Sequence, residues 1–193
     1  MVRLPDYYTT KAHREKYLAR SVYKLLEINE KYKFLHPGDR VLDLGSAPGS
    51  WLQYSSKIVG PKGFILGLDL QIITASLTEN VKTLQADIFT IDLVKFMELW
   101  GTFGVILSDM APHTTGTKIV DQQRSLELAR VSYKMADVVL EKGGNYLVKV
   151  FQSEDVSSFF SQIKNRFCQC QLIKPKSSRK ESFELYILGL DKK

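Results

Sequence analysis

Apolar stretches recur along the chain and predict buried β-strands. Five of them precede residue 152, and they read RVLDLG (40–45), GFILGLDL (63–70), NVKTLQADIF (80–89), GVILSDMAP (104–112) and NYLVKVF (145–151). Segments with the apolar spacing of helices lie before and between them, at 21–32, 51–59, 91–100 and 121–141. Ser21 is the expected N-cap of the first helix. Strands that alternate with helices predict βαβ units and a mostly parallel sheet.

The C-terminal part of the chain breaks this alternation. Two strand-like runs, CQCQLIKP (168–175) and FELYILGL (183–190), are joined by the basic loop KSSRKES (176–182), which leaves no room for a helix. Strands connected in this way pair antiparallel, so we expect the pair to close one edge of the sheet. The predicted fold class is α/β, a mostly parallel seven-stranded sheet with an antiparallel strand at one edge and helices on both faces.

Length and composition fit one domain over residues 1–193. The 193 residues are 44% hydrophobic and 25% charged, without repeats, low-complexity tracts or linker-like stretches. No apolar run approaches the ~20 residues needed to cross a bilayer, and the N-terminus lacks an apolar signal-peptide core. We expect an intracellular monomer without a membrane partner, and its compartment, mitochondrial or cytoplasmic, stays open.

The two cysteines of the chain, Cys168 and Cys170, have no histidine near them in the sequence. Zinc sites in proteins need further thiolate or imidazole ligands at characteristic spacings. We therefore expect neither a metal site nor a disulfide, and we expect reduced thiols.

Positive charge is concentrated near both ends of the chain, whose net charge is +6. The N-terminal basic cluster comprises Lys11, His13, Arg14, Lys16, Arg20 and Lys24. The C-terminal basic cluster comprises Lys174, Lys176, Arg179 and Lys180. Basic ends around a nearly balanced middle favour a phosphate backbone lying across one face. Solvated charged helices and a charged loop would produce the same pattern, so charge alone does not decide the partner.

A glycine-containing turn, residues 45–51, follows the first predicted strand. In doubly wound sheets such turns lie where ligands bind, and Gly45 and Gly49 allow close approach of the backbone. Ser50 is a candidate cap of the next helix. A dinucleotide site would need G-x-G-x-x-G, but Ala47 replaces the second glycine and Pro48 removes an amide donor. The turn therefore favours a nucleoside ligand without phosphates.

Aspartates mark the ends of three successive predicted strands. Asp43 belongs to the first strand, Asp69 ends the second and Asp87 ends the third. A carboxylate at the position of Asp69 can accept hydrogen bonds from both ribose hydroxyls, and Asp87 is placed to receive an adenine amino group. Each aspartate alone also fits a strand-end cap, whereas three in succession favour a ligand site.

Four charged residues occupy positions that disfavour charge. Asp109 ends the fourth predicted strand, and Lys149 lies inside the apolar run NYLVKVF. Burying such a lysine is costly unless a carboxylate meets it. Glu184 starts the last strand and Lys24 lies among apolar residues of the first helix. Either alone could be a structural charge, Lys24 extending to solvent and Glu184 protecting a sheet edge.

Taken together, these motifs resemble the FtsJ/RrmJ family of RNA ribose 2′-O-methyltransferases over Asp6 to about Leu190. The matching segments are RSVYKLLEI, VLDLGSAPGSW, DLQ, SDMAP, GGNYLVKVF and IKPKSSRKESFELYIL. The resemblance implies a Rossmann-like S-adenosylmethionine-dependent methyltransferase fold and a catalytic tetrad of Lys24, Asp109, Lys149 and Glu184. It also implies donor binding by Gly49, Trp51, Asp69, Asp87 and Asp109, to which the turn adds Gly45 and Ser50. One departure is His113, where the family commonly has asparagine.

The chemistry agrees with these residue types. A ribose 2′-hydroxyl is a weak nucleophile, so catalysis needs in-line positioning and help in removing or steering one proton. A lysine acts as the base only when its pKa is lowered, and a purely positional mechanism stays open.

By resemblance, the substrate is large-subunit ribosomal RNA, with a uridine as the modified nucleotide and residues 1–35 as a basic helical extension that contributes to RNA binding. The alternatives are a transfer RNA or messenger-RNA-cap ribose methyltransferase and a non-catalytic ribosome-assembly factor with the same fold. A Rossmann dehydrogenase is disfavoured by Ala47 and Pro48.

Overall fold

The computed structural model describes residues 6–179 and 181–193. Residues 1–5 of the predicted N-terminal extension and Lys180 of the C-terminal basic cluster lie outside the described residues. The helices are α1 (Tyr7–Arg14), α2 (Val22–Tyr32), α3 (Ser50–Val59), α4 (Leu93–Trp100), α5 (Lys118–Val139) and α6 (Val156–Arg166). The strands are β1 (Arg40–Leu44), β2 (Phe64–Asp69), β3 (Val81–Gln85), β4 (Phe103–Ser108), β5 (Leu140–Phe151), β6 (Phe167–Ile173) and β7 (Glu184–Lys192).

The seven strands form one sheet with the order β3-β2-β1-β4-β5-β7-β6. β1 pairs in parallel with β2 on one side and with β4 on the other, so the strand order reverses beside β1. Ligands of doubly wound sheets bind at this reversal, outside the carboxyl ends of the strands. The predicted α/β class and its mostly parallel sheet are confirmed.

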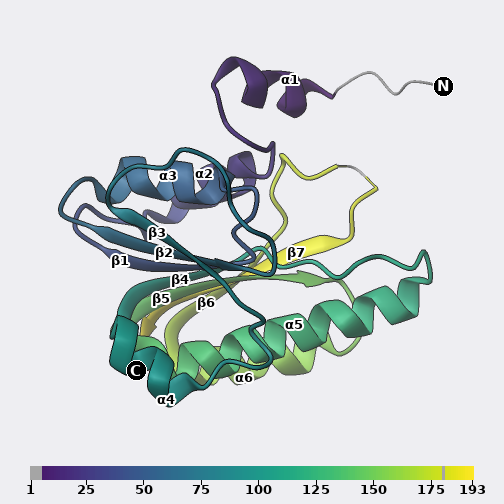
Figure 1. Cartoon of the computed structure of the whole chain (residues 1–193). Coiled ribbons are helices and arrows are strands. Elements are labelled where there is room, and N and C mark those ends of the chain that lie inside the picture. The colour runs from purple at the N-terminus through teal and green to yellow at the C-terminus, as the bar shows by residue number, and fades with distance from the viewer. Residues whose placement is uncertain (1–5, 180) are drawn as a thin grey trace.

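Helices cover both faces of the sheet, as predicted. Helices α2 and α3 lie on one face, whereas α4, α5 and α6 lie on the other (Figure 1). Each face has its own apolar core, because alternate residues of a strand point to opposite sides. In β1, Val41 packs with the α2 and α3 side, and Leu42 and Leu44 pack with the α4 to α6 side.

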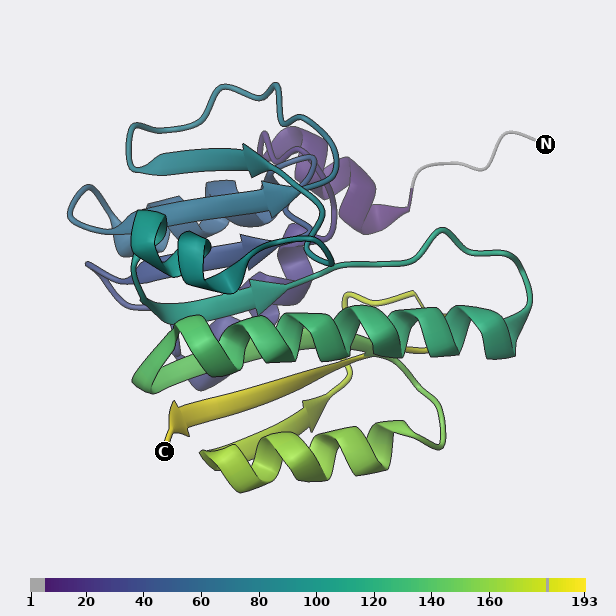
Figure 2. The same cartoon turned by 60° about the horizontal axis from the view of Figure 1, so that its bottom comes forward.

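The C-terminal strands close one edge of the sheet as an antiparallel pair, as expected. β7 pairs antiparallel with β6 and also with β5, so it lies between them and leaves β6 outermost (Figure 2). The chain reaches this edge through α6, a helix that the apolar pattern did not predict. Its sequence VSSFFSQIKNR is rich in serine, and Phe159 and Ile163 supply its buried face.

One predicted helix cap holds only in position and the other is wrong. Ser21 is the N-cap residue of α2, but it has helical backbone angles and makes no capping hydrogen bond, and its hydroxyl pairs with that of Ser50 at 3.0 Å. Ser50 is the first residue inside α3, and the residue that precedes the helix is Gly49 with φ +113°. Both serines instead join α2 to α3, because the start of each helix lies against the other.

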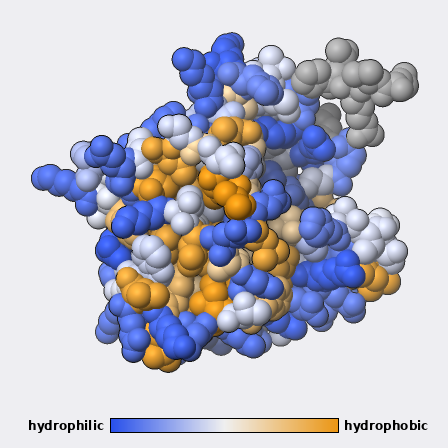
Figure 3. Space-filling model, in the orientation of Figure 1, coloured by the Kyte–Doolittle hydropathy of each residue, from blue (hydrophilic) through white to orange (hydrophobic). Residues whose placement is uncertain are grey.

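The outer surface is unevenly apolar. Orange surface gathers over α4 and the adjoining part of the sheet, whereas much of the rim is polar (Figure 3). On α4, Val94 is 63% exposed and Leu99 is 78% exposed. Among residues 6–179 and 181–193, no helix combines the length and the apolar character needed to cross a bilayer.

Candidate active site

A cavity of about 450 Å³ opens at the carboxyl ends of β1, β2 and β4, where the strand order reverses. This volume lies within the range of small-molecule sites, about 300–1,000 Å³. We call it the donor pocket. Its lining includes Gly45, Ala47, Asp69, Leu70, Asp87, Phe89, Asp109, Met110 and His113.

The turn at Gly45 is held closely against the loop after β4. Gly45 has φ +76°, and a Cβ there would lie 2.6 Å from Met110 Cγ and 2.9 Å from Met110 Cα. A side chain is therefore excluded both by the backbone conformation and by the neighbouring backbone. The N–H of Gly45 donates to the Leu68 carbonyl at 2.8 Å, so the turn is also tied to β2. The wall of the pocket thus needs glycine at this position.

Asp69 and Asp87 both line the donor pocket and both order the backbone around it. Asp69 Oδ2 accepts from the Ala47 N–H at 2.9 Å, and Oδ1 accepts from the Gln71 N–H at 2.8 Å. Asp87 Oδ1 accepts from the Phe89 N–H at 3.0 Å. Because each carboxylate oxygen has two lone pairs, both residues can still accept hydrogen bonds from a ligand.

Asp43 lies beneath this turn and is fully buried. Among the described residues, no group hydrogen-bonds to either of its carboxylate oxygens or to the buried Ser46 hydroxyl. Burial, together with the negative charges of Asp109 and Asp69, raises the pKa of Asp43 well above its ordinary value. Neither residue lines the donor pocket, so these buried polar groups lie behind its wall rather than in it.

Three of the predicted donor-binding residues, Gly49, Ser50 and Trp51, are not among the residues that line the pocket. Trp51 is 2% exposed, and its indole N–H donates to the Ser21 carbonyl at 2.9 Å. Ser50 is occupied by its contact with Ser21. A Cβ on Gly49 would lie 3.1 Å from Leu18 Cδ1. These residues present only their backbone at the start of α3, where N–H groups have no partner within the helix.

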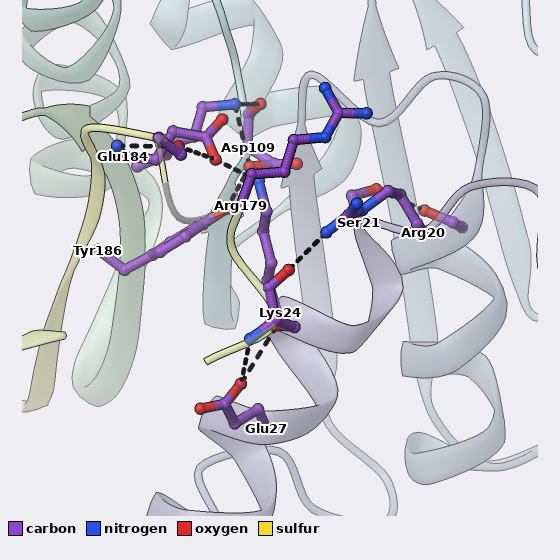
Figure 4. Close-up of polar contacts among 12 residues, drawn as sticks. Arg20, Ser21, Lys24, Glu27, Asp109, Arg179, Glu184 and Tyr186 are labelled. Carbon is purple, nitrogen blue, oxygen red and sulfur yellow. Dashed lines mark hydrogen bonds and ion pairs between the residues drawn. The ribbon is translucent and has the colours of Figure 1, made fainter. Parts of the chain in front are cut away.

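The four predicted catalytic residues come together beside the donor pocket, on the face that carries α2. Strand register explains how. In the parallel pair β4–β5, Ser108 lies opposite Val148, which brings Asp109 next to Lys149. In the antiparallel pair β5–β7, Lys149 lies opposite Tyr186. Lys24 approaches from α2 and Glu184 from the first residue of β7 (Figure 4).

The tetrad consists of two ion pairs. Lys149 Nζ lies 3.0 Å from Asp109 Oδ1 and donates to the Asp109 carbonyl at 2.5 Å. Lys24 Nζ lies 2.6 Å from Glu184 Oε2. Lys149 is only 5% exposed, so it is the costly buried lysine that the sequence indicated, and Asp109 is the carboxylate that meets it.

Tyr186 connects the two pairs, although it was not among the predicted site residues. Its hydroxyl donates to Asp109 Oδ1 at 2.6 Å, and Lys24 Nζ lies 5.9 Å from the centre of its ring. Burial and the charges of Asp109 and Glu184 raise the pKa of Tyr186 well above its ordinary value, so the hydroxyl keeps its proton. Alternation in FELYIL places it on the same face as Glu184, a signal that could have found it.

Asp109 is shared by the tetrad and the donor pocket. Burial by itself would raise the pKa of Asp109, but the charges of Lys149 and Lys24 outweigh that effect. With the hydrogen bonds from Tyr186 and Lys149, they hold the pKa below its ordinary value. Asp109 is therefore a stable anion at neutral pH, and it joins the two parts of the site.

A second cavity, of about 740 Å³, lies on the other side of the tetrad, and we call it the acceptor cleft. It is lined by Arg20, Ser21, Lys24, Arg179, Glu181, Ser182 and Glu184. The Arg20 guanidinium pairs with Asp6 and donates to the Ser177 carbonyl at 2.6 Å. The cleft thus joins parts of both basic clusters, which are far apart in the sequence.

A nucleoside-sized pocket at the reversal of such a sheet, beside two lysine–carboxylate pairs, is typical of a Rossmann-like methyltransferase. The chain belongs to the FtsJ-like methyltransferase family, whose model matches residues 17–192. The members of that family use S-adenosylmethionine, and the carboxylates of Asp69 and Asp87 in the pocket lining fit the hydroxyl and amino groups of this donor.

Named relatives of this chain are methyltransferases as well. The ribosomal RNA large subunit methyltransferase E of Syntrophobacter fumaroxidans is 43% identical over 186 residues, 96% of this chain and 94% of that protein. The protein of the same name from Bdellovibrio bacteriovorus is 42% identical and is covered to 97%, as is this chain. A solved structure described as a ribosomal RNA methyltransferase from Plasmodium falciparum matches with a TM-score of 0.80 at 29% identity, covering 91% of this chain and 98% of that one.

Proposed function

We propose that this protein transfers the methyl group of S-adenosylmethionine to the 2′-oxygen of a ribose, that of a uridine, in large-subunit ribosomal RNA. The observation that carries the proposal is the pair of lysine–carboxylate contacts, Lys149–Asp109 and Lys24–Glu184, beside the donor pocket. The names of the relatives from Syntrophobacter and Bdellovibrio support the substrate.

In this proposal the donor occupies the pocket of about 450 Å³. Asp69 accepts from the ribose hydroxyls of the donor and Asp87 from its adenine amino group. Backbone N–H groups of Gly49, Ser50 and Trp51, at the start of α3, bind its carboxylate, since helix N-termini favour anions. Gly45 keeps the turn close to the ligand.

The bound donor supplies a methyl group that its sulfonium already activates. The 2′-oxygen forms the new bond to that carbon as the carbon–sulfur bond breaks, and the hydroxyl proton must leave. Lys149 Nζ, held by two Asp109 oxygens, orients the 2′-hydroxyl and removes or steers this proton. Lys24 and Glu184 hold the acceptor ribose from the other side.

The RNA backbone would lie in the acceptor cleft and across the N-terminal helices. Arg20 and Arg179 line the cleft, and the last turn of α1 carries Lys11, His13 and Arg14. Clustered cations of this kind bind phosphates, and their affinity falls as salt rises. We therefore propose that residues 1–35 contribute to RNA binding. We also propose that the chain is one methyltransferase domain and that it acts as an intracellular monomer.

The test is transfer of labelled methyl to large ribosomal subunits and to naked ribosomal RNA, followed by nuclease mapping of the modified residue. We expect label on one 2′-oxygen and its loss in Lys149→Ala and Asp109→Ala. Label on a base would contradict the proposed chemistry. Label on transfer RNA or cap structures alone would favour those substrates, and no label on any RNA would favour an assembly factor.

A further inference from the structure

A carboxylate on α2 holds the loop that connects β6 to β7. Glu27 lies three residues after Lys24, and its carboxylate faces this loop (Figure 4). Oε1 accepts from the Lys176 backbone N–H at 2.8 Å. Oε2 accepts from the Ser177 N–H at 3.1 Å and from the Ser177 hydroxyl at 3.2 Å. One side chain thus binds three donors of a loop about 150 positions away.

Ser177 is held from a second direction. Its carbonyl accepts from the Arg20 guanidinium at 2.6 Å, and the residue is only 1% exposed. The N–H, hydroxyl and carbonyl of this one residue are therefore all bound by α2 or by the turn before it. A loop residue with every polar group satisfied in this way is fixed relative to α2. We call this set of contacts the Glu27 latch.

The latch fixes the position of one wall of the acceptor cleft relative to the other. Arg20, Ser21 and Lys24 form one wall, and Arg179, Glu181 and Ser182 of the loop contribute to the other. The loop also orients Glu184, since Ser182 Oγ lies 3.1 Å from Glu184 Oε2 and accepts from the Glu184 N–H at 3.2 Å. Movement of the loop would therefore displace both the cleft wall and the Lys24–Glu184 pair.

A negative charge here is unexpected on a surface that binds RNA, because it weakens the attraction of phosphates. We propose that Glu27 is a positioning residue for the acceptor RNA, which acts by holding the β6–β7 loop and, through it, Arg179 and Glu184. The proposal rests on the proposed function, since it concerns the RNA substrate of that same site. Glu27 itself contacts neither donor nor tetrad.

The test compares Glu27→Gln with the matched control Glu30→Gln. The glutamine at 27 places an amide N–H₂ against a backbone N–H and breaks part of the latch. Glu30 lies on the same helix and is exposed, and its side chain makes no hydrogen bond or ion pair with the described residues, so its variant removes the same charge alone. We expect kcat/KM for RNA to fall about tenfold or more in Glu27→Gln, mainly through KM, with unchanged donor affinity. Glu30→Gln should leave it unchanged or slightly raised.

Amide hydrogen exchange tests the latch without RNA. Exchange of the Lys176 and Ser177 amides should accelerate in Glu27→Gln and stay unchanged in Glu30→Gln. Ser177→Ala keeps both N–H contacts but loses the hydroxyl contact to Glu27, so we expect kcat/KM for RNA to fall about threefold. If Glu27→Gln misfolds, this milder variant takes its place in each comparison.

Three results would overturn the positioning role. They are unchanged exchange in Glu27→Gln, faster exchange with unchanged kcat/KM for RNA, or equal effects of Glu27→Gln and Glu30→Gln. A wild-type protein that methylates no RNA would refute the proposed function and this role with it, although faster exchange would still establish the latch.

Discussion

The donor pocket and the acceptor cleft are adjacent, but they are assembled in different ways. The pocket is lined mainly by residues that directly follow parallel strands, and its key contacts join positions near one another, such as Ala47 and Asp69. The cleft depends on contacts between distant segments, and Lys24 and Glu184 are 160 positions apart. A strand-end pocket needs only the correct strand order, whereas the cleft needs the register of β7 and a fixed loop. No described residue lines both the pocket and the cleft, and Asp109 joins the pocket to the tetrad that lies between them, so substitutions should affect the two regions separately.

The largest effect is expected for Lys149→Ala. Loss of the group that removes or steers the proton should lower kcat by about 10²–10⁴-fold, while donor affinity stays within about twofold of wild type. Single-turnover methyl transfer and equilibrium donor binding measure the two quantities. Donor binding that falls in parallel with kcat would contradict the separation of the donor pocket from the tetrad.

Asp69→Ala should produce the opposite pattern. It removes an acceptor for the donor ribose and the contact that holds the Ala47 N–H. Hydrogen bonds to a charged group contribute about 1.5–3 kcal/mol, so donor affinity should fall by about 10–100-fold with little change in RNA affinity. Donor titration and RNA filter binding check both. If RNA affinity fell by the same factor as donor affinity, the structure of the cleft would depend on that of the pocket.

Asp43→Asn should change the stability of the donor-free protein. Burial raises the pKa of Asp43 above its ordinary value of 3.8. Its ionisation is therefore more costly in the folded than in the unfolded chain, and it lowers stability as pH rises from 3.8 toward the folded pKa. The asparagine variant should lose this part of the pH dependence and gain Tm at neutral pH, about 2–4 °C per kcal/mol. Thermal unfolding across pH tests this, and an unchanged pH dependence would contradict it.

The smallest effect is expected for His113→Asn, which introduces the residue that the family resemblance leads us to expect there. His113 is exposed at the rim of the donor pocket and makes no side-chain hydrogen bond with the described residues. Exposed substitutions of this kind change stability by less than about 0.5 kcal/mol, so kcat/KM should stay within about threefold. A larger change in KM for RNA, with unchanged donor affinity, would show that the loop of His113 contacts the RNA.

Much of the donor pocket could be predicted because its information is local. Apolar runs indicate the strands, and the polar residues at their ends point to Asp69, Asp87 and Asp109 as candidates for the pocket lining. The positions of Gly49, Ser50 and Trp51 were less predictable. Their motif indicates a ligand turn, but whether a side chain points into the pocket or against α2 depends on how the two helices pack.

The residues alone therefore determined the α/β class, the strand-end pocket and Lys149 and Asp109 as candidates, whereas Lys24 and Glu184 were assigned to the tetrad by the family resemblance. The residues alone could do so because a parallel sheet aligns its strand ends by a general rule and because a lysine within an apolar strand needs a buried counter-charge. The pairing of Lys149 with Asp109 and of Lys24 with Glu184, the link through Tyr186 and the latch at Glu27 required the tertiary structure. These contacts join segments up to 160 positions apart, and strand register and helix packing, which no local pattern encodes, decide which groups meet.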